Sequence, residues 1–112
     1  MKGRLGDPQR IAHILEAIEE IEGYIKGVNY ATFLDKSIIR FATIKQLEII
    51  GEAANHISKE LQLSTPDISW REIISLRNFL VHEYFGVDEI IIWQIITVDI
   101  PHLKEKLNNI TF

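Results

Sequence analysis

The middle of the chain reads Leu47-Glu48-Ile49-Ile50-Gly51-Glu52-Ala53-Ala54, and its apolar residues recur at helical spacing. Gly51 and the two alanines after it remove side-chain bulk from this helix, so that another backbone can approach closely. A glycine inside a helix costs about 1 kcal/mol relative to alanine. We therefore expect this stretch to be the contact point of a tightly packed helix pair.

Helical signals continue toward the N-terminus. Asp7 and Pro8 have the residue types of an N-cap and a first helical residue, and Gly27 is a plausible end for the helix that follows. The central helix is then expected to begin after Asp35, as its N-cap, and to run to about Leu61. These patterns predict two long helices in the first half of the chain.

The second half of the chain predicts two further helices. A loop over residues 63–67 precedes the capping box Ser69-Trp70-Arg71-Glu72, which begins a third helix, and Gly86 suggests that this helix ends within residues 82–85. Asp88 is expected to cap a fourth helix. Pro101 must kink or interrupt that helix, because proline lacks the N–H and clashes with the preceding turn.

The chain has 112 residues and no pattern of alternating polar and apolar residues. It is therefore predicted to be a single domain over residues 1–112, an all-α up-down bundle of four main helices whose last helix is interrupted at Pro101. The fourth helix is more apolar than a small bundle requires, which favours a dimer.

Composition excludes several classes of function. The chain has no cysteine, which rules out disulfides, thiolate nucleophiles and cysteine-ligated zinc. No segment approaches the roughly 20 apolar residues of a membrane span, so we expect a cytoplasmic protein. The net charge of −4 argues against non-specific nucleic-acid binding, and any RNA chemistry must use a local patch.

The candidate site lies in the third helix, in the run Arg77-Asn78-Phe79-Leu80-Val81-His82-Glu83-Tyr84. An arginine that is always charged can hold a phosphate, and an imidazole that titrates near neutral pH can move a proton. Together they suffice for phosphodiester chemistry without a metal or another cofactor. A structural role for both side chains is the alternative.

Helical rotation constrains how this run can act. At about 100° per residue, Arg77 and Tyr84 share one stripe of the helix, whereas His82 lies about 140° away from Arg77. A working site therefore requires either a break of the helix at His82 or a two-fold axis that brings His82 of one chain beside Arg77 of another. Asn78 either orients His82 or hydrogen-bonds the backbone near the helix end.

Three other groups of side chains have both a functional and a structural interpretation. The tryptophans, which could stack on bases, are more typical of core or interface anchors. The histidines outside the motif have no metal-ligand spacing. The basic residues of the central helix either contact RNA or balance the acidic first helix. The tryptophans are Trp70 and Trp93, and the histidines outside the motif are His13, His56 and His102. The basic residues of the central helix are Lys36, Arg40 and Lys45.

Residues 47–54, 68–74 and 77–88 together resemble the HEPN superfamily, and within it the HepT-like toxins. The motif of that branch, an arginine, four residues, a histidine, one residue and a tyrosine, is complete in Arg77, His82 and Tyr84. The resemblance implies a homodimeric ribonuclease with Arg77 and His82 as its catalytic pair. It also implies a partner, an MntA-like nucleotidyltransferase antitoxin that neutralises the toxin by attaching AMP to Tyr84.

Two other functions stay open at this point. Related helical domains pair with nucleotidyltransferases as non-catalytic substrate-binding subunits, and Arg77 and His82 would then bind a nucleotide. The acidic composition favours this alternative, because an isoelectric point of about 5.5 is unusual for a ribonuclease. The third possibility is a structural dimer in which the motif only packs.

Overall fold

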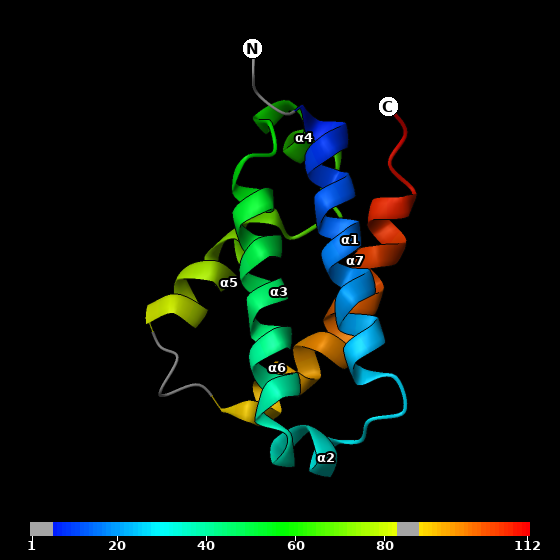
Figure 1. Ribbon diagram of the computed structural model, residues 1–112. Helices are drawn as coiled ribbons and strands as arrows, with labels where there is room; N and C mark the ends of the chain where they lie inside the picture. Colours follow the sequence, from blue (N-terminus) through cyan, green and yellow to red (C-terminus); the bar gives the residue numbers. More distant parts are fainter. Residues whose placement is uncertain (1–5, 83–87) are drawn as a thin grey trace.

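The fold is all-α, as predicted, and the computed structural model describes residues 6–82 and 88–112, with the side chains of residues 81 and 82 outside this description. The helices run down, up, down and up along the bundle (Figure 1). Their bounds are α1 (Asp7–Ile25), α2 (Tyr30–Asp35), α3 (Ser37–Asn55), α4 (Lys59–Ser64), α5 (Trp70–His82), α6 (Glu89–Gln94), the π-helical turn η2 (Ile95–Asp99) and α7 (Ile100–Asn108).

The core lies between α1, α3, α5 and the α6–η2–α7 segment. In Figure 1, α1 and α3 lie antiparallel and α7 runs beside α1, whereas α5 crosses α3 obliquely and its C-terminal end points away from α1. An ion pair between Lys104 Nζ and Glu22 Oε1, 2.9 Å apart, joins α7 to α1. The completely buried large side chains are Ile14, Ile18, Ile21, Phe33, Leu47, Ile50, Leu80, Ile92 and Leu107.

The predicted N-cap at Asp7 was wrong. The N-cap of α1 is Gly6, and Asp7 is already the first helical residue. The Asp7 carboxylate instead accepts hydrogen bonds from Ser58 N at 2.9 Å and from Ser58 Oγ at 2.6 Å. Asp7 therefore fastens the start of α1 to the start of α4, a tertiary contact that local capping signals do not show.

The single central helix expected from Asp35, as its N-cap, to about Leu61 was also wrong, because two helices, α3 and α4, occupy this region. Asp35 is the last residue of α2 rather than a cap, and Lys36 takes the N-cap position of α3 without a side-chain hydrogen bond. The chain leaves α3 after Asn55. Ser58 then caps α4, because its side chain accepts from Leu61 N at 3.1 Å.

The sequence of the second half predicted the helix boundaries more closely. The predicted loop begins at Thr65 rather than at residue 63, since α4 extends to Ser64. Ser69 precedes α5, and its carbonyl accepts from Ile73 N at 3.1 Å, but neither side-chain hydrogen bond of the predicted capping box forms among the described residues. Asp88 caps α6 by accepting from Ile90 N at 3.0 Å.

The interruption at Pro101 is confirmed as the π-helical turn η2, which stands immediately before α7. Thr97 Oγ1 within this turn donates to the carbonyl of Trp93 at 2.6 Å, a bond that bends helices. Proline lies in the first turn of α7, where its missing N–H costs little. The hydrogen-bond pattern of the fourth helix is thus interrupted before Pro101, and the chain changes direction between α6 and α7 (Figure 1).

Both tryptophans have the structural role expected of them. Trp70 is 4% exposed and its Nε1 donates to Thr65 Oγ1 at 2.8 Å. The ring of Trp93 packs at 5.1 Å from that of Phe33 and at 5.9 Å from that of Tyr30, measured between centroids. These contacts join α2 to α6 and anchor the loop before α5.

Thr43 allows the cost of an unpaired hydroxyl in this core to be measured. It is completely buried in α3, and its hydroxyl has no hydrogen-bond partner in the described part of the chain. Because an unpaired buried hydroxyl costs about 1–3 kcal/mol, we expect Thr43→Val to raise the free energy of unfolding by about 1 kcal/mol in urea denaturation.

Thr65→Val is the matched control for this prediction. The Thr65 hydroxyl accepts from Trp70 Nε1 and donates to the Leu61 carbonyl, each at 2.8 Å. The same substitution should therefore destabilise the protein at this position. Equal effects of the two substitutions would show that the Thr43 hydroxyl is not a cost to stability.

Candidate active site

Arg77 is the motif residue that the structure describes most fully, and its backbone lies directly against Gly51. A Cβ atom placed on Gly51 would lie 2.9 Å from Arg77 Cβ, 3.0 Å from Arg77 N and 3.2 Å from the carbonyl oxygen of Ile73. A side chain on residue 51 would force α3 and α5 apart. The close approach predicted from Gly51 is therefore confirmed, and it occurs at the motif arginine itself.

The guanidinium of Arg77 is held by a carboxylate of the facing helix. Its Nε lies 3.1 Å from Oε1 of Glu52, and the two side chains are 47% and 51% exposed. The other carboxylate oxygen of Glu52 lies 3.1 Å from Nε2 of His56, one turn later in α3. The result is a short chain of three charged or titratable groups, His56, Glu52 and Arg77, at the surface between α3 and α5.

Sequence reasoning assigned no role to Glu52 and gave His56 only a surface or structural one. A signal was nevertheless present, because Gly51 marks the point where a second helix touches α3. The residue after Gly51 then lies at the edge of that contact, within reach of the neighbouring helix. What could not be known from the sequence is which residue of α5 would face it.

Of the other predicted site residues, the structure describes Asn78 and the backbone of His82. Asn78 is exposed, and its side chain makes no hydrogen bond with any other described residue, so neither of its predicted roles is decided. His82 is the last residue of α5, and its side chain lies outside the described residues, as does the whole of Tyr84. Because α5 is α-helical from Trp70 to His82, its rotation separates Arg77 and His82 by about 140°.

Comparison with known proteins identifies the family. The family model described as "Ribonuclease HepT-like" matches residues 14–110, which include the whole Arg77–Tyr84 run. The chain belongs to the HepT-like ribonuclease family. This result confirms the resemblance found in the sequence.

Relatives of this HepT-like chain occur in several organisms. A Thermococcus cleftensis protein named "Probable ribonuclease HepT" is 41% identical over 97 residues, which cover 87% of this chain and 88% of the relative. A Methanocaldococcus jannaschii protein that carries a provisional RNase name is 38% identical over 94 residues, covering 84% and 86%. No solved structure matches the chain.

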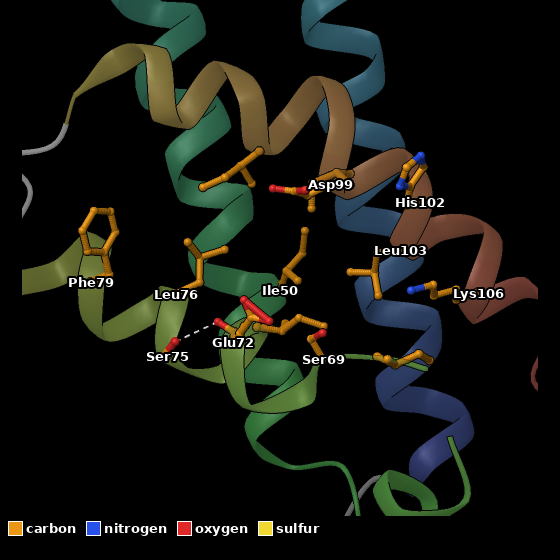
Figure 2. Close-up of a pocket in the computed structure, with 14 residues that line it drawn as sticks. Ile50, Ser69, Glu72, Ser75, Leu76, Phe79, Asp99, His102, Leu103 and Lys106 are labelled. Carbon is orange, nitrogen blue, oxygen red and sulfur yellow. Dashed lines mark hydrogen bonds between the residues drawn. The ribbon is translucent and has the colours of Figure 1, made fainter. Parts of the chain in front are cut away.

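One pocket of the HepT-like chain lies beside the motif arginine, and Phe79 of the motif run lines it. Figure 2 shows this pocket between α5 and the η2–α7 segment, with a volume of about 490 Å³. Its wall is formed by apolar side chains such as Ile50, Leu76 and Leu103, whereas Asp99 and His102 supply polar groups. Arg77 does not line this pocket, although its α5 neighbours Ile73 and Leu76 do.

The three basic residues expected either to contact RNA or to balance the acidic first helix differ in their surroundings. Arg40 is engaged at the corner between α2 and α3, where its Nη1 donates to the Leu34 carbonyl and its guanidinium lies 6.0 Å from the ring centroid of Phe41. Lys36 and Lys45 are exposed. Arg77 is paired with Glu52, and Arg71 is exposed on the same helix.

Two further findings concern metals and membranes. No group of three or more histidine, aspartate or glutamate side chains gathers as a potential metal site within residues 6–82 and 88–112. None of the helices that the structure describes is both long and apolar enough to cross a lipid bilayer.

Proposed function

We propose that this chain is a metal-independent endoribonuclease and the toxin of a toxin–antitoxin pair. The observation that carries the proposal is the half-exposed Arg77 guanidinium, fixed at the α3–α5 contact five residues before a histidine, in a chain of the HepT-like ribonuclease family. An anchored but accessible guanidinium suits a group that must meet a phosphate without reorganising. His82 then supplies the proton transfer.

The proposed chemistry uses the ribose 2′-hydroxyl as the nucleophile. His82 as a neutral imidazole accepts the 2′-hydroxyl proton while O2′ bonds to the adjacent phosphorus. The bond from phosphorus to O5′ breaks, and a protonated imidazole returns a proton to O5′. Arg77 stabilises the charge on the non-bridging oxygens. The products are a 2′,3′-cyclic phosphate end and a 5′-hydroxyl end.

A homodimer would solve the geometric problem of the motif. One regular α5 directs Arg77 and His82 to different faces, so a two-fold axis must bring His82 of the partner subunit toward Arg77. Such an axis needs an apolar surface near the motif. Phe79 in α5, Ile91 in α6 and Val98 in η2 are 37%, 42% and 51% exposed, and they supply apolar area on the elements that flank the motif.

A ribonuclease assay tests this proposal directly. The purified wild-type protein should cleave single-stranded RNA in the presence of a chelator, and the fragments should carry 2′,3′-cyclic phosphate ends. The same RNA with 2′-O-methyl groups should resist cleavage, because it lacks the nucleophile. Activity that disappears with the chelator, or fragments with 3′-hydroxyl ends, would contradict the mechanism.

Control by a MntA-like nucleotidyltransferase antitoxin is the second part of the proposal. Tyr84 follows Arg77 by seven residues, which places the two on one stripe in a continued helix. AMP on the Tyr84 hydroxyl would put a phosphate within reach of the arginine and compete with RNA. Mass spectrometry after co-expression with such an enzyme should find AMP on Tyr84. Neutralisation of the toxin with Tyr84 unmodified would refute this route.

Composition favours one second candidate, a non-catalytic partner subunit of a nucleotidyltransferase. The net charge of −4 is unfavourable for binding long RNA but no obstacle to binding a single nucleotide at Arg77. Expression in cells separates the two functions. Growth arrest by the chain alone, lost in Arg77→Ala, supports the toxin, whereas harmless expression together with nucleotide-dependent binding to the enzyme supports the subunit.

A further inference from the structure

Glu52 has no role in the chemistry proposed above, yet it is the described side chain that contacts the Arg77 guanidinium. It accepts from Nε, the nitrogen at the inner side of the guanidinium, at 3.1 Å. A guanidinium has five N–H donors, and the four on the terminal Nη atoms form the fork that binds a phosphate with two hydrogen bonds. A carboxylate at Nε leaves that fork available.

The carboxylate of Glu52 is itself held from the other side. Its second oxygen lies 3.1 Å from Nε2 of His56, one helical turn away in α3. Both ends of the carboxylate are thus engaged, which restricts rotation of the Glu52 side chain. Gly51 meanwhile fixes the distance between the helices at the Arg77 backbone. Gly51 therefore restrains the backbone of Arg77, and Glu52, the next residue, restrains its guanidinium.

This ion pair is poorly suited to a purely stabilising role. All three side chains are about half exposed, at 46%, 51% and 47% for His56, Glu52 and Arg77, and ion pairs this exposed contribute little to folding. A negative charge beside a phosphate-binding group also opposes the binding of RNA unless it serves another purpose. The contact with Nε gives Glu52 such a purpose, which is to orient the Arg77 guanidinium.

We infer that Glu52 is a positioning residue, which directs the terminal nitrogens of Arg77 toward the scissile phosphate. This inference rests on the proposed ribonuclease function. It predicts that removing Glu52 lowers kcat without weakening the binding of RNA. A misplacement of about 1 Å can reduce a rate by about 100-fold, so a loss of about 10-fold or more in kcat is expected for Glu52→Ala.

Glu48 provides the matched control. It lies one turn earlier in α3 and makes no hydrogen bond or ion pair within the described part of the chain, so Glu48→Ala removes the same charge without touching Arg77. We expect Glu48→Ala to keep the wild-type kcat. Glu52→Gln retains an oxygen that can accept from Arg77 Nε, and it should recover part of the activity lost in Glu52→Ala. A 2′-O-methyl RNA should bind to Glu52→Ala at least as tightly as to the wild type.

The position of Arg77 can be followed without any catalysis. The Nε–Hε signal of Arg77 in nitrogen–proton NMR spectra, assigned by its disappearance in Arg77→Lys, should shift and exchange faster with water in Glu52→Ala but not in Glu48→Ala. An unchanged signal in Glu52→Ala, or a kcat equal to that of Glu48→Ala, would overturn the inference. If the wild type cleaves no RNA, the proposed function is refuted, and the NMR comparison still decides whether Glu52 holds Arg77.

Discussion

Arg77→Ala and His82→Ala should each nearly abolish RNA cleavage while the protein stays folded. Loss of one donor to a developing negative charge typically costs about 10²–10³ in kcat, and loss of a general acid–base group about 10²–10⁴. Both rates should be measured by single-turnover cleavage of one labelled RNA with a chelator present. Arg77 is half exposed, so its replacement should leave the unfolding transition nearly unchanged.

Arg71→Ala is the appropriate control for the arginine. Arg71 is exposed on the same helix, six residues before Arg77, and removing it changes the net charge by the same amount. A protein with Arg71→Ala should cleave RNA at close to the wild-type rate. If Arg71→Ala and Arg77→Ala lost activity equally, general charge rather than a specific phosphate contact would explain the effect, and the proposed role of Arg77 would fail.

Gly51→Ala should destabilise the protein relative to Gly23→Ala by about 1–3 kcal/mol. Both glycines lie within helices, so alanine gains about 1 kcal/mol of helix propensity at either position. A Cβ on Gly23 meets nothing within 4 Å, whereas a Cβ on Gly51 would lie 2.9 Å from Arg77 Cβ and 3.0 Å from its backbone nitrogen. Overpacking of this kind costs about 1–3 kcal/mol.

The comparison of the two glycine variants requires only urea denaturation of each protein. Subtracting the change in unfolding free energy of Gly23→Ala from that of Gly51→Ala removes the propensity term and leaves the cost of the contact. Stabilisation of both proteins by the same amount would show that α5 moves away from α3 freely. In that case the fixed placement of Arg77, on which the proposed site depends, would be wrong.

The sequence predicted the fold well where the determining interactions are local. Asp88 caps the helix that follows it, and Pro101 marks the interruption before α7, because both effects depend on residues only a few positions away. The prediction of Asp7 as an N-cap failed because its partner is distant in the sequence. Its carboxylate has a better partner in Ser58, fifty-one residues later, and no local pattern shows such a contact.

The sequence predicted the motif residues of the candidate site but not Glu52, which contacts Arg77. Arg77, with His82 and Tyr84, was found from its spacing and from a family resemblance. The role of Glu52 depends on the angle and register at which α3 and α5 cross, which determine that it faces Arg77 rather than another residue. Helix crossing is set by packing of many side chains together, so it becomes visible only in three dimensions.

The π-helical turn at Ile95–Asp99 has a consequence for how such chains can vary in length. A π turn holds one more residue than an α-helical turn without shifting the helix that follows out of phase. A deletion of one residue within this turn would restore α-helical hydrogen bonding and leave Leu103 and Leu107 facing the core. The same deletion within α7, between those two leucines, would rotate every residue after it by about 100° relative to the residues before it. Single-residue insertions and deletions in homologous chains should therefore be tolerated at this turn and rejected on either side of it.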